Sequence, residues 1–390
     1  MRGKGRASRI EIARRAINAH LIGVRGAAAR LATPALTIDL AKMRANLAWM
    51  NRRCAAAGMR LRPHGKTHKC SAIAREQLSA GAAGICAASP HEAIAFARAG
   101  IRGLLVTAPV VQPAHLAALA DLHRRGVDLM VVIDHPDGVA AWTKALGRVE
   151  RKLPVLVDVD LGMGRTGARS PKDVVEIARR VDASAALSNA GVQAYSGRVQ
   201  HIERFGERRR VYLEQIRKLA AALRSLEAAG FAAKIVSGGG TGTFAIDIEH
   251  GLYTESQAGS YLFMDVEYNA VELFRTQRNP YSTALLMRTS VISAHVPGHV
   301  TINAGFKCFA TDGPAPALQG ALARAARYEF FGDEYGRVVL GKGQRAPKVG
   351  SHVDLITPHC DPTVNLHDFY HVLAGDTLIG IWPIDARGVS

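Results

Sequence analysis

Lys66 lies in a short segment whose residue types suit covalent chemistry with an aldehyde. The segment reads Arg62-Pro-His-Gly-Lys-Thr-His-Lys69 and follows a predicted strand. Gly65 leaves room for a planar ligand, and a lysine amine that is partly desolvated or flanked by positive charge can form a Schiff base. His64 and Lys69 would supply that charge. A basic surface loop is the alternative interpretation of the same residues.

A glycine-rich run ends another predicted strand and is suited to holding an anion. It reads Ser237-Gly-Gly-Gly-Thr-Gly-Thr243. Consecutive glycines let backbone N–H groups converge on an anion, and hydroxyl groups add donors. In a barrel of parallel strands, phosphate groups are usually held near the seventh and eighth strands. A plain loop has the same composition. The predicted phosphate-binding residues are Ser237, Gly239, Gly240, Thr241 and Gly242.

His359 and Asp361 form a potential metal pair near the C-terminus, within Thr357-Pro-His-Cys-Asp-Pro-Thr-Val-Asn-Leu-His-Asp368. In an extended chain, residues two apart point to the same side, so both side chains could reach one ion while Cys360 points away. Imidazole with carboxylate suits Mn²⁺, Mg²⁺ or Zn²⁺. A β-turn is the alternative, because His, Asp and Pro are common loop residues.

The elements that position these residues follow a βα rhythm, in which short β-branched runs alternate with Ala-rich stretches of helical period. Eight such units in about 200 residues predict a (β/α)₈ TIM barrel, with an open doubly wound sheet as the alternative. The expected strands are Leu36–Asp39, Leu61–Pro63, Gly84–Ala88, Leu104–Thr107, Leu129–Ile133, Val155–Val159, Gly191–Ala194 and Lys234–Ser237. The expected helices are Leu40–Ala57, Ser71–Ala80, Pro90–Ala99, Pro113–Arg124, Pro136–Leu146, Pro171–Val181 and Glu203–Ala229.

After about Asn279 the helical stretches give way to β-rich runs punctuated by Gly and Pro. This change predicts a mostly β C-terminal domain over residues 279–390, following a barrel over residues 31–278. Residues 1–30 carry eight Arg or Lys against the single acidic Glu11. We interpret them as a basic, solvated extension; a nucleic-acid or membrane arm and a transit peptide are the alternatives.

The composition narrows the class of protein. A formal charge of +17 would attract anionic substrates or a phosphate cofactor, but no aromatic platform or recognition motif supports nucleic-acid binding. The sequence has no uninterrupted run of about 18 apolar residues, so we expect no membrane span. The five cysteines are scattered and odd in number, which favours a reducing, cytoplasmic location over a disulfide framework.

Two motifs at matching spacing resemble a known family. Thr33-Pro-Ala-Leu36 through Asp39 precedes the His-Gly-Lys-Thr-His-Lys run that contains Lys66. Together they resemble the D-threonine aldolase and D-serine dehydratase family of fold-type III, alanine racemase-like enzymes, from about residue 33 to the C-terminus. The resemblance implies a barrel followed by a β domain, pyridoxal 5'-phosphate on Lys66, and a homodimer.

The resemblance also implies roles for residues at strand ends. It places Arg165 opposite the pyridine nitrogen, which would keep that nitrogen unprotonated because guanidinium is always charged; a phosphate or surface contact is the alternative. Gln193 and Tyr195 end the predicted seventh strand and could hydrogen-bond the ring or the substrate. The segment that contains Tyr261 resembles one that lies near the cofactor in this family. The resemblance also places the catalytic base at about His201, for which an exposed histidine at a helix start is the alternative.

The metal motif separates the branches of this family. It resembles the aldolase site, where a His and an Asp two residues later bind the divalent ion, whereas the dehydratases typically carry Cys at the second position. Asp361 therefore favours a metal-activated aldolase that cleaves D-β-hydroxy amino acids such as D-threonine, D-allo-threonine or 3-hydroxyaspartate to glycine and an aldehyde. The alternative is a D-serine or 3-hydroxyaspartate dehydratase that yields a 2-oxo acid and ammonia. Cys360, one place earlier, leaves the register open.

Overall fold

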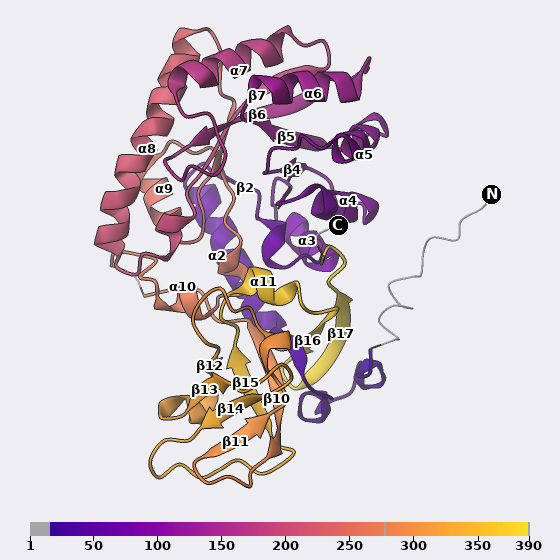
Figure 1. Ribbon diagram of the computed structural model, residues 1–390, viewed down its shortest axis with the longest axis vertical. Coiled ribbons are helices and arrows are strands. Elements are labelled where there is room, and N and C mark those ends of the chain that lie inside the picture. The colour runs from indigo at the N-terminus through magenta and orange to yellow at the C-terminus, as the bar shows by residue number, and fades with distance from the viewer. Residues whose placement is uncertain (1–15, 277, 389–390) are drawn as a thin grey trace, which may run out of the picture.

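The computed structural model describes residues 16–276 and 278–388, and it places a barrel beside a second, β-rich unit (Figure 1). Eight parallel strands pair in the order β2-β9-β8-β7-β6-β5-β4-β3, and an isolated bridge between His64 and Cys86 joins the two end strands. The predicted barrel is therefore confirmed. Its strands are β2 (Arg60–Leu61), β3 (Ile85–Ala87), β4 (Leu104–Val106), β5 (Leu129–Ile133), β6 (Leu153–Asp160), β7 (Leu187–Tyr195), β8 (Ile235–Gly238) and β9 (Glu255–Ser256).

Helices cover the outside of the barrel, and local sequence fixes where several of them begin. Ser170 and Asp173 form a reciprocal capping box at the start of one helix, and Pro171 occupies its first turn. Ser89 caps another by accepting from the amide of Glu92. None of the described helices is long and apolar enough to span a bilayer. The helices are α2 (Leu40–Ala56), α3 (Ser71–Ser79), α4 (Pro90–Arg98), α5 (Pro113–Arg124), α6 (Pro136–Leu146), α7 (Pro171–Ala183), α8 (Phe205–Ala228), α9 (Phe244–His250) and, beyond the strands, α10 (Val266–Ala270).

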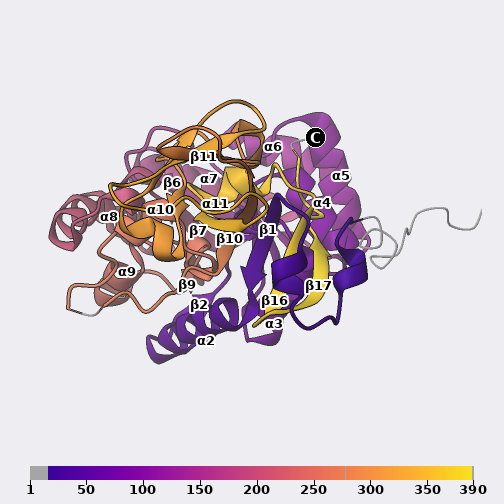
Figure 2. The same cartoon turned by 90° about the horizontal axis from the view of Figure 1, so that it is seen from below.

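The first predicted barrel strand belongs to the other sheet. β1 (Ala35–Asp39) pairs antiparallel with β10 and parallel with β16 of the C-terminal unit, which corrects the placement of Leu36–Asp39 (Figure 2). The eighth barrel strand is instead the two-residue β9, whose Glu255 is fully buried and pairs with Arg62 at 2.8 Å. A hydrophobic pattern shows that a segment is a buried strand, but it does not show which sheet the strand joins.

The C-terminal unit is a nine-stranded sheet whose main path runs β13-β14-β11-β10-β1-β16-β17, and it confirms the predicted mostly β domain. A short helix, α11 (Cys360–Val364), follows β15 and faces the barrel. Its strands after β1 are β10 (Leu285–Ser293), β11 (His299–Ile302), β12 (Ala317–Leu318), β13 (Arg327–Phe330), β14 (Gly336–Val339), β15 (His352–Ile356), β16 (Phe369–Ala374) and β17 (Thr377–Pro383).

Hydrogen bonds fix the two units against each other near α11. The hydroxyl of Tyr370 on β16 donates to the carbonyl of His68 at 2.8 Å, and the amide of Cys360 donates to the carboxylate of Asp265 at 3.0 Å. Tyr370, Cys360 and Asp265 are all fully buried. The junction therefore has a defined geometry, and it holds α11 over the carboxyl end of β2.

The described part of the N-terminal region packs on the β domain. Leu21, Ala27 and Leu31 form a small apolar cluster with residues of β16 and β17. The amide of Gly23 donates to the carbonyl of Leu378 at 2.8 Å. Residues 16–30 are thus bound to the sheet, unlike the solvated extension that the charge pattern predicts. The prediction for residues 1–15 lies outside the described residues.

Candidate active site

Lys66 lies just beyond the carboxyl end of β2, in the 3₁₀ turn η3 (Gly65–Thr67). A Cβ atom at Gly65 would stand 2.6 Å from the ring of Phe96, so only glycine allows the turn to approach that ring. The Nζ atom of Lys66 contacts Oδ2 of Asp361, on α11, at 2.9 Å. A barrel loop and the β domain therefore meet at the lysine.

The charge environment of Lys66 differs from the one that its sequence neighbours predict. Lys69 pairs with Glu92 at 2.6 Å, and burial lowers the pKa of His64 to about 3, so that His64 is neutral. The negative charge of Asp361 raises the pKa of Lys66 above its usual range. The expectation that His64 and Lys69 flank the amine with positive charge is therefore wrong: the amine is a charged ammonium paired with a carboxylate.

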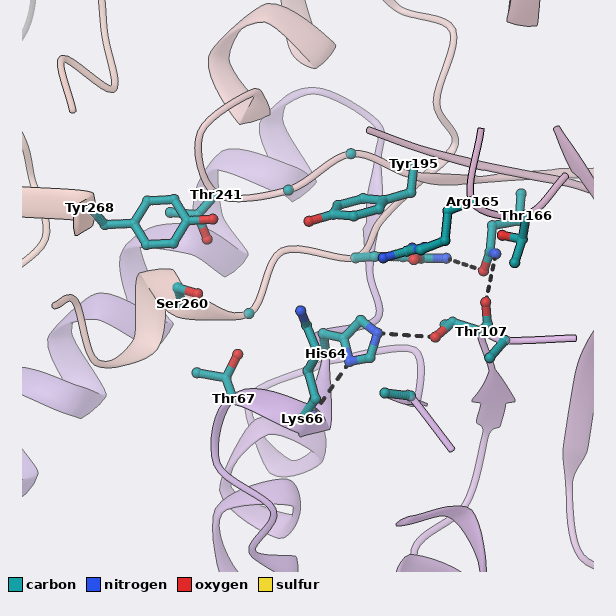
Figure 3. Close-up of a pocket in the computed structure, with 17 residues that line it drawn as sticks. His64, Lys66, Thr67, Thr107, Arg165, Thr166, Tyr195, Thr241, Ser260 and Tyr268 are labelled. Carbon is teal, nitrogen blue, oxygen red and sulfur yellow. Dashed lines mark hydrogen bonds between the residues drawn. The ribbon is translucent and has the colours of Figure 1, made fainter. Parts of the chain in front are cut away.

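Lys66 opens onto a cavity of about 370 Å³ at the carboxyl ends of the strands (Figure 3). This is the end of a barrel where ligands bind, and the volume suits a small cofactor. Seven predicted residues line it, namely Lys66, Arg165, Gln193, Tyr195, Gly239, Gly240 and Thr241. His64 lines it too, as do residues to which the sequence motifs gave no role, among them Thr107, Gln257, Ser260 and Tyr268.

The glycine edge of the cavity is closely packed from behind. Gly239 has φ +66°, and a Cβ atom there would collide with the carboxylate of Asp247. At Gly240 a Cβ atom would lie 2.6 Å from the side-chain oxygen of Gln200. Because the chain has no side chain at either position, it can lie against these groups and leave the cavity side open. This edge fits an anionic group such as a phosphate.

Three predicted cofactor residues do not line the cavity. The hydroxyl of Ser237 donates to Glu255 at 2.8 Å, and the amide of Gly242 donates to Gln200 at 2.9 Å. Tyr261 is fully buried, with its ring centroid 5.8 Å from that of Tyr281. These residues stand behind the wall, where they support it.

Arg165 and Tyr195 lie on the side of the cavity that faces His64 and Lys66 (Figure 3). The guanidinium carbon of Arg165 is 5.8 Å from the centroid of the Tyr195 ring. The neighbouring Thr166 donates to the buried Asp158 at 2.8 Å, which ties the loop that carries Arg165 to the end of β6. The loop is thereby held in place although Arg165 itself is exposed.

A buried hydrogen-bond network holds the polar side chains at the floor of the cavity. Gln193 donates to Asp158 and to the carbonyl of Thr107, both at 2.9 Å, and it accepts from Gln257 at 3.1 Å. Burial raises the pKa of Asp158 to about 6. His64 completes this side through a contact of 3.1 Å with the Thr107 hydroxyl. The floor is therefore fixed before any ligand binds.

His359 and Asp361 meet at the start of α11, although not on an extended chain as predicted. His359 is the N-cap residue and Asp361 lies in the first turn, with His359 Nε2 3.9 Å from Asp361 Oδ2. Cys360 between them points into the interior, where its sulfur lies 3.8 Å from the Met264 carbonyl. The helical turn thus brings the His and Asp together and separates the Cys from them.

The unpaired oxygen of Asp361 suits a cation. Burial alone would raise the pKa of Asp361, but the charges of Lys66 and His359 outweigh it and lower that pKa below its usual range. The Oδ1 atom is buried and has no hydrogen-bond partner among the described residues. An orphaned buried carboxylate oxygen beside an imidazole fits a divalent ion. No group of three or more potential ligands occurs in the described chain, so water or substrate would complete the shell.

His201 lies in the 3₁₀ segment η4 (Arg198–His201), and its ring stands beside that of His359. Its ring centroid is 6.4 Å from that of His359 and 4.8 Å from that of the cavity residue Tyr268. Its Nδ1 atom is 3.5 Å from a carboxylate oxygen of Glu267, and burial lowers the pKa of His201. The predicted base, metal pair and lysine are therefore neighbours in space.

Comparisons with known proteins cover both units. Residues 38–267 match the family described as alanine racemase, N-terminal domain, and residues 284–373 match the putative serine dehydratase domain. The 3-hydroxy-D-aspartate aldolase of Paracoccus denitrificans (strain Pd 1222) is 36% identical over 360 residues, 91% of this chain and 92% of the relative. The D-threonine aldolase of Arthrobacter sp is 37% identical over 366 residues, 93% and 94% of the two chains.

The structure of the D-threonine aldolase from Filomicrobium marinum has a TM-score of 0.87 to this chain at 32% identity, and the match covers 91% of this chain and 95% of the other. A D-threo-3-hydroxyaspartate dehydratase from Delftia sp. (strain HT23) is more distant, at 26% identity over 90% of this chain and 97% of the relative. The aldolases are thus more similar to this chain than the dehydratase is.

Proposed function

Because this chain belongs to the alanine racemase-like family that includes D-threonine and 3-hydroxy-D-aspartate aldolases, we propose that it cleaves D-β-hydroxy amino acids to glycine and an aldehyde. The observation that carries this proposal is that Lys66, which lines the cavity, contacts Asp361, which in turn lies beside His359. An amine for carbonyl chemistry and a carboxylate–imidazole pair for a cation stand together there. Substrates of this class include D-threonine, D-allo-threonine and 3-hydroxyaspartate.

The cavity residues divide the task of holding pyridoxal 5'-phosphate, the cofactor that family membership implies. When bound, that group supplies an aldehyde and an electron-accepting ring. Lys66 would provide the amine, and the Gly239–Thr241 edge would hold the phosphate. Arg165 would face the ring nitrogen, while Gln193 and Tyr195 would border the ring. Ser237, Gly242 and Tyr261 would act by supporting this wall.

His359 and Asp361 would hold a divalent ion, for which Mn²⁺, Mg²⁺ and Zn²⁺ are the candidates. Such an ion supplies Lewis acidity that lowers the pKa of a substrate hydroxyl. His201 would then accept the hydroxyl proton, since its lowered pKa keeps the imidazole neutral and able to act as a base. Tyr268 packs against the His201 ring and would limit access of water from that side.

Dehydration is the second candidate, because residues 284–373 match a domain described as a putative serine dehydratase. In that case Lys66 would remove the Cα proton, and the product would be a 2-oxo acid with ammonia. The position of Asp361 favours cleavage, since the dehydratases that this motif resembles typically carry Cys there.

A product assay separates the two candidates. The reconstituted protein is incubated with D-threonine and, separately, with D-serine, with and without added Mn²⁺. We expect glycine and acetaldehyde from D-threonine, in equal amounts and dependent on the metal. Ammonia without glycine would overturn the aldolase proposal.

We further propose that the protein acts as a cytoplasmic homodimer on a small-molecule substrate. The five cysteines are scattered along the chain and all of them are buried, which supports a reducing compartment. Sedimentation at enzyme concentrations used in the assay tests the dimer, and a single species at 41.7 kDa would contradict it.

A further inference from the structure

Asp312 contacts the candidate metal ligand His359 from outside the site. Its Oδ2 atom lies 2.8 Å from Nδ1 of His359, within hydrogen-bond distance. Asp312 belongs to the loop between η6 (Phe306–Cys308) and β12, and its side chain is 52% exposed. No sequence motif singles out this residue, so only the structure connects it with α11.

The two ring nitrogens of His359 face different partners. Nδ1 faces Asp312, whereas Nε2 is 3.9 Å from Oδ2 of Asp361. A carboxylate at Nδ1 favours the tautomer with hydrogen on that atom, which leaves the lone pair on Nε2 directed toward Asp361. Asp312 stands at the opposite edge of the imidazole ring from the space between Nε2 and Asp361. It therefore contacts the ligand and not the ion.

Other histidines at helix starts in this chain use Nδ1 differently. Nδ1 of His64 accepts from the amide of Lys66, and Nδ1 of His135 accepts from the amide of Asp137. Both rings are fixed by capping their own helices. His359 is also an N-cap residue, yet its side chain makes no capping hydrogen bond. Its Nδ1 atom is thus available to Asp312, which fixes the ring in place of a cap.

The loop that carries Asp312 is attached to the helix that follows His359. The amide of Ala310 donates to the hydroxyl of Thr363 on α11 at 3.1 Å, and Thr363 is fully buried. On the other side of Asp312, Gly313 lies against the carboxylate of Glu267. The loop is therefore held on both sides of Asp312, although the Asp312 side chain itself is half exposed.

We propose that Asp312 is a positioning residue for the divalent ion: it fixes the tautomer and orientation of His359 so that Nε2 and Asp361 present a ready-made pair. This inference rests on the metal site of the proposed function. Carboxylates in this arrangement orient metal-binding histidines, and their loss typically lowers metal affinity by about 10–100-fold.

The test is the dissociation constant for Mn²⁺, measured on cofactor-loaded enzyme from the electron paramagnetic resonance signal of free Mn²⁺. We expect Asp312→Ala to raise this constant by about 10–100-fold. Visible absorption of the bound cofactor and the thermal midpoint should stay unchanged, because Asp312 is exposed and contacts neither the cavity nor the core.

Two matched variants isolate the orienting role. Asp312→Asn keeps an oxygen acceptor for Nδ1 and should recover most of the affinity. Glu334→Ala removes one carboxylate from an exposed site on the same domain, where Glu334 pairs with Lys307, and should leave the constant within about twofold of wild type.

The possible results separate this inference from the proposed function. Wild-type affinity in Asp312→Ala would overturn the inference alone, as would an equal loss in Asp312→Asn, which would indicate that charge and not hydrogen-bond acceptance matters. A wild-type enzyme that binds no Mn²⁺ would overturn the metal site, and the inference would fall with it. Selective loss in Asp312→Ala with recovery in Asp312→Asn supports it.

Discussion

The two halves of the site are built in different ways. The barrel half consists of strand ends whose polar groups are tied into a buried network, in which Gln193 and Asp158 are almost fully buried. The β-domain half depends on one short helix and on an exposed loop: the side chains of His359 and Asp312 are 22% and 52% exposed. The barrel half, which would hold the cofactor, is therefore part of a core. The β-domain half, which would hold the metal, depends on a domain junction and on contacts open to water.

This difference indicates how each half should respond to change. A substitution in the barrel half alters a packed wall, so it should affect cofactor binding and stability together. A substitution in the β-domain half alters a few contacts of a short helix, so it should affect metal binding with little effect on stability. Lys66 and Asp361 link the halves, since their contact crosses the junction.

The largest effect is expected for Lys66→Ala. Without the amine, the visible absorption of bound cofactor should disappear and turnover should fall by at least about 10³-fold, as for other covalent catalytic groups. Absorption spectra and a glycine assay measure both. Lys342→Ala, at an exposed position, is the control. An unchanged absorption band with normal turnover would show that another lysine holds the cofactor.

Asp361→Ala should separate the halves. We expect Mn²⁺ binding to be lost and turnover to fall by about 10²-fold or more, because the ion loses one of two protein ligands. The cofactor absorption should persist, since Lys66 and the other side chains that line the cavity all remain. Asp368→Ala, at an exposed residue after the same helix, is the control. If Cys360→Ala alone abolished metal binding, Asp361 would not be the ligand.

Gly240→Ala should weaken the barrel half more moderately. The added methyl group would stand 2.6 Å from the side-chain oxygen of Gln200 and force the glycine edge to move. A strain of about 1–3 kcal/mol corresponds to a loss of about 5- to 150-fold in cofactor affinity. Fluorescence titration with the cofactor measures it. Gly206→Ala has open space around it and should bind normally; equal affinities in the two variants would remove Gly240 from the phosphate edge.

The smallest effect concerns pH and Asp247, which lies behind the glycine edge. Burial raises the pKa of Asp247 to about 7, above its value of about 3.9 in an unfolded chain. A raised carboxyl pKa means that its contribution to stability is full below about pH 4 and is lost as pH rises toward 7. The urea midpoint of the wild type should therefore fall relative to that of Asp247→Asn over this interval. The exposed control Asp182→Asn should follow the wild type at every pH. If the urea midpoint of Asp247→Asn also changed with pH as that of the wild type does, the raised pKa of Asp247 would be contradicted.

The sequence predicted most of the barrel because its strands are apolar and its helices carry good starts. It misplaced the first strand, since β1 has the same apolar pattern whether it joins the barrel or the second sheet. It missed β9, because two buried polar residues give no hydrophobic signal. Glu255 is buried there only because Arg62 from a distant part of the chain pairs with it.

Motifs predicted the lysine, the glycine edge and the His–Asp pair, because each depends on local spacing. The floor of the cavity could not be predicted in this way. Thr107 and Gln257 come from separate segments and meet through Gln193 only after the barrel closes. The prediction that positive charges flank Lys66 was wrong for a similar reason. Lys69 is paired with Glu92, and the charge that acts most strongly on the Lys66 amine is that of Asp361, 295 positions away.

Anomalous diffraction from Mn²⁺ in crystals of the cofactor-loaded enzyme would locate the metal and the cofactor lysine in one experiment. We expect a peak within about 2.0–2.6 Å of both His359 Nε2 and Asp361, next to cofactor density joined to Lys66. A peak held by Cys360 or by residues outside the junction, or cofactor density joined to another lysine, would contradict it.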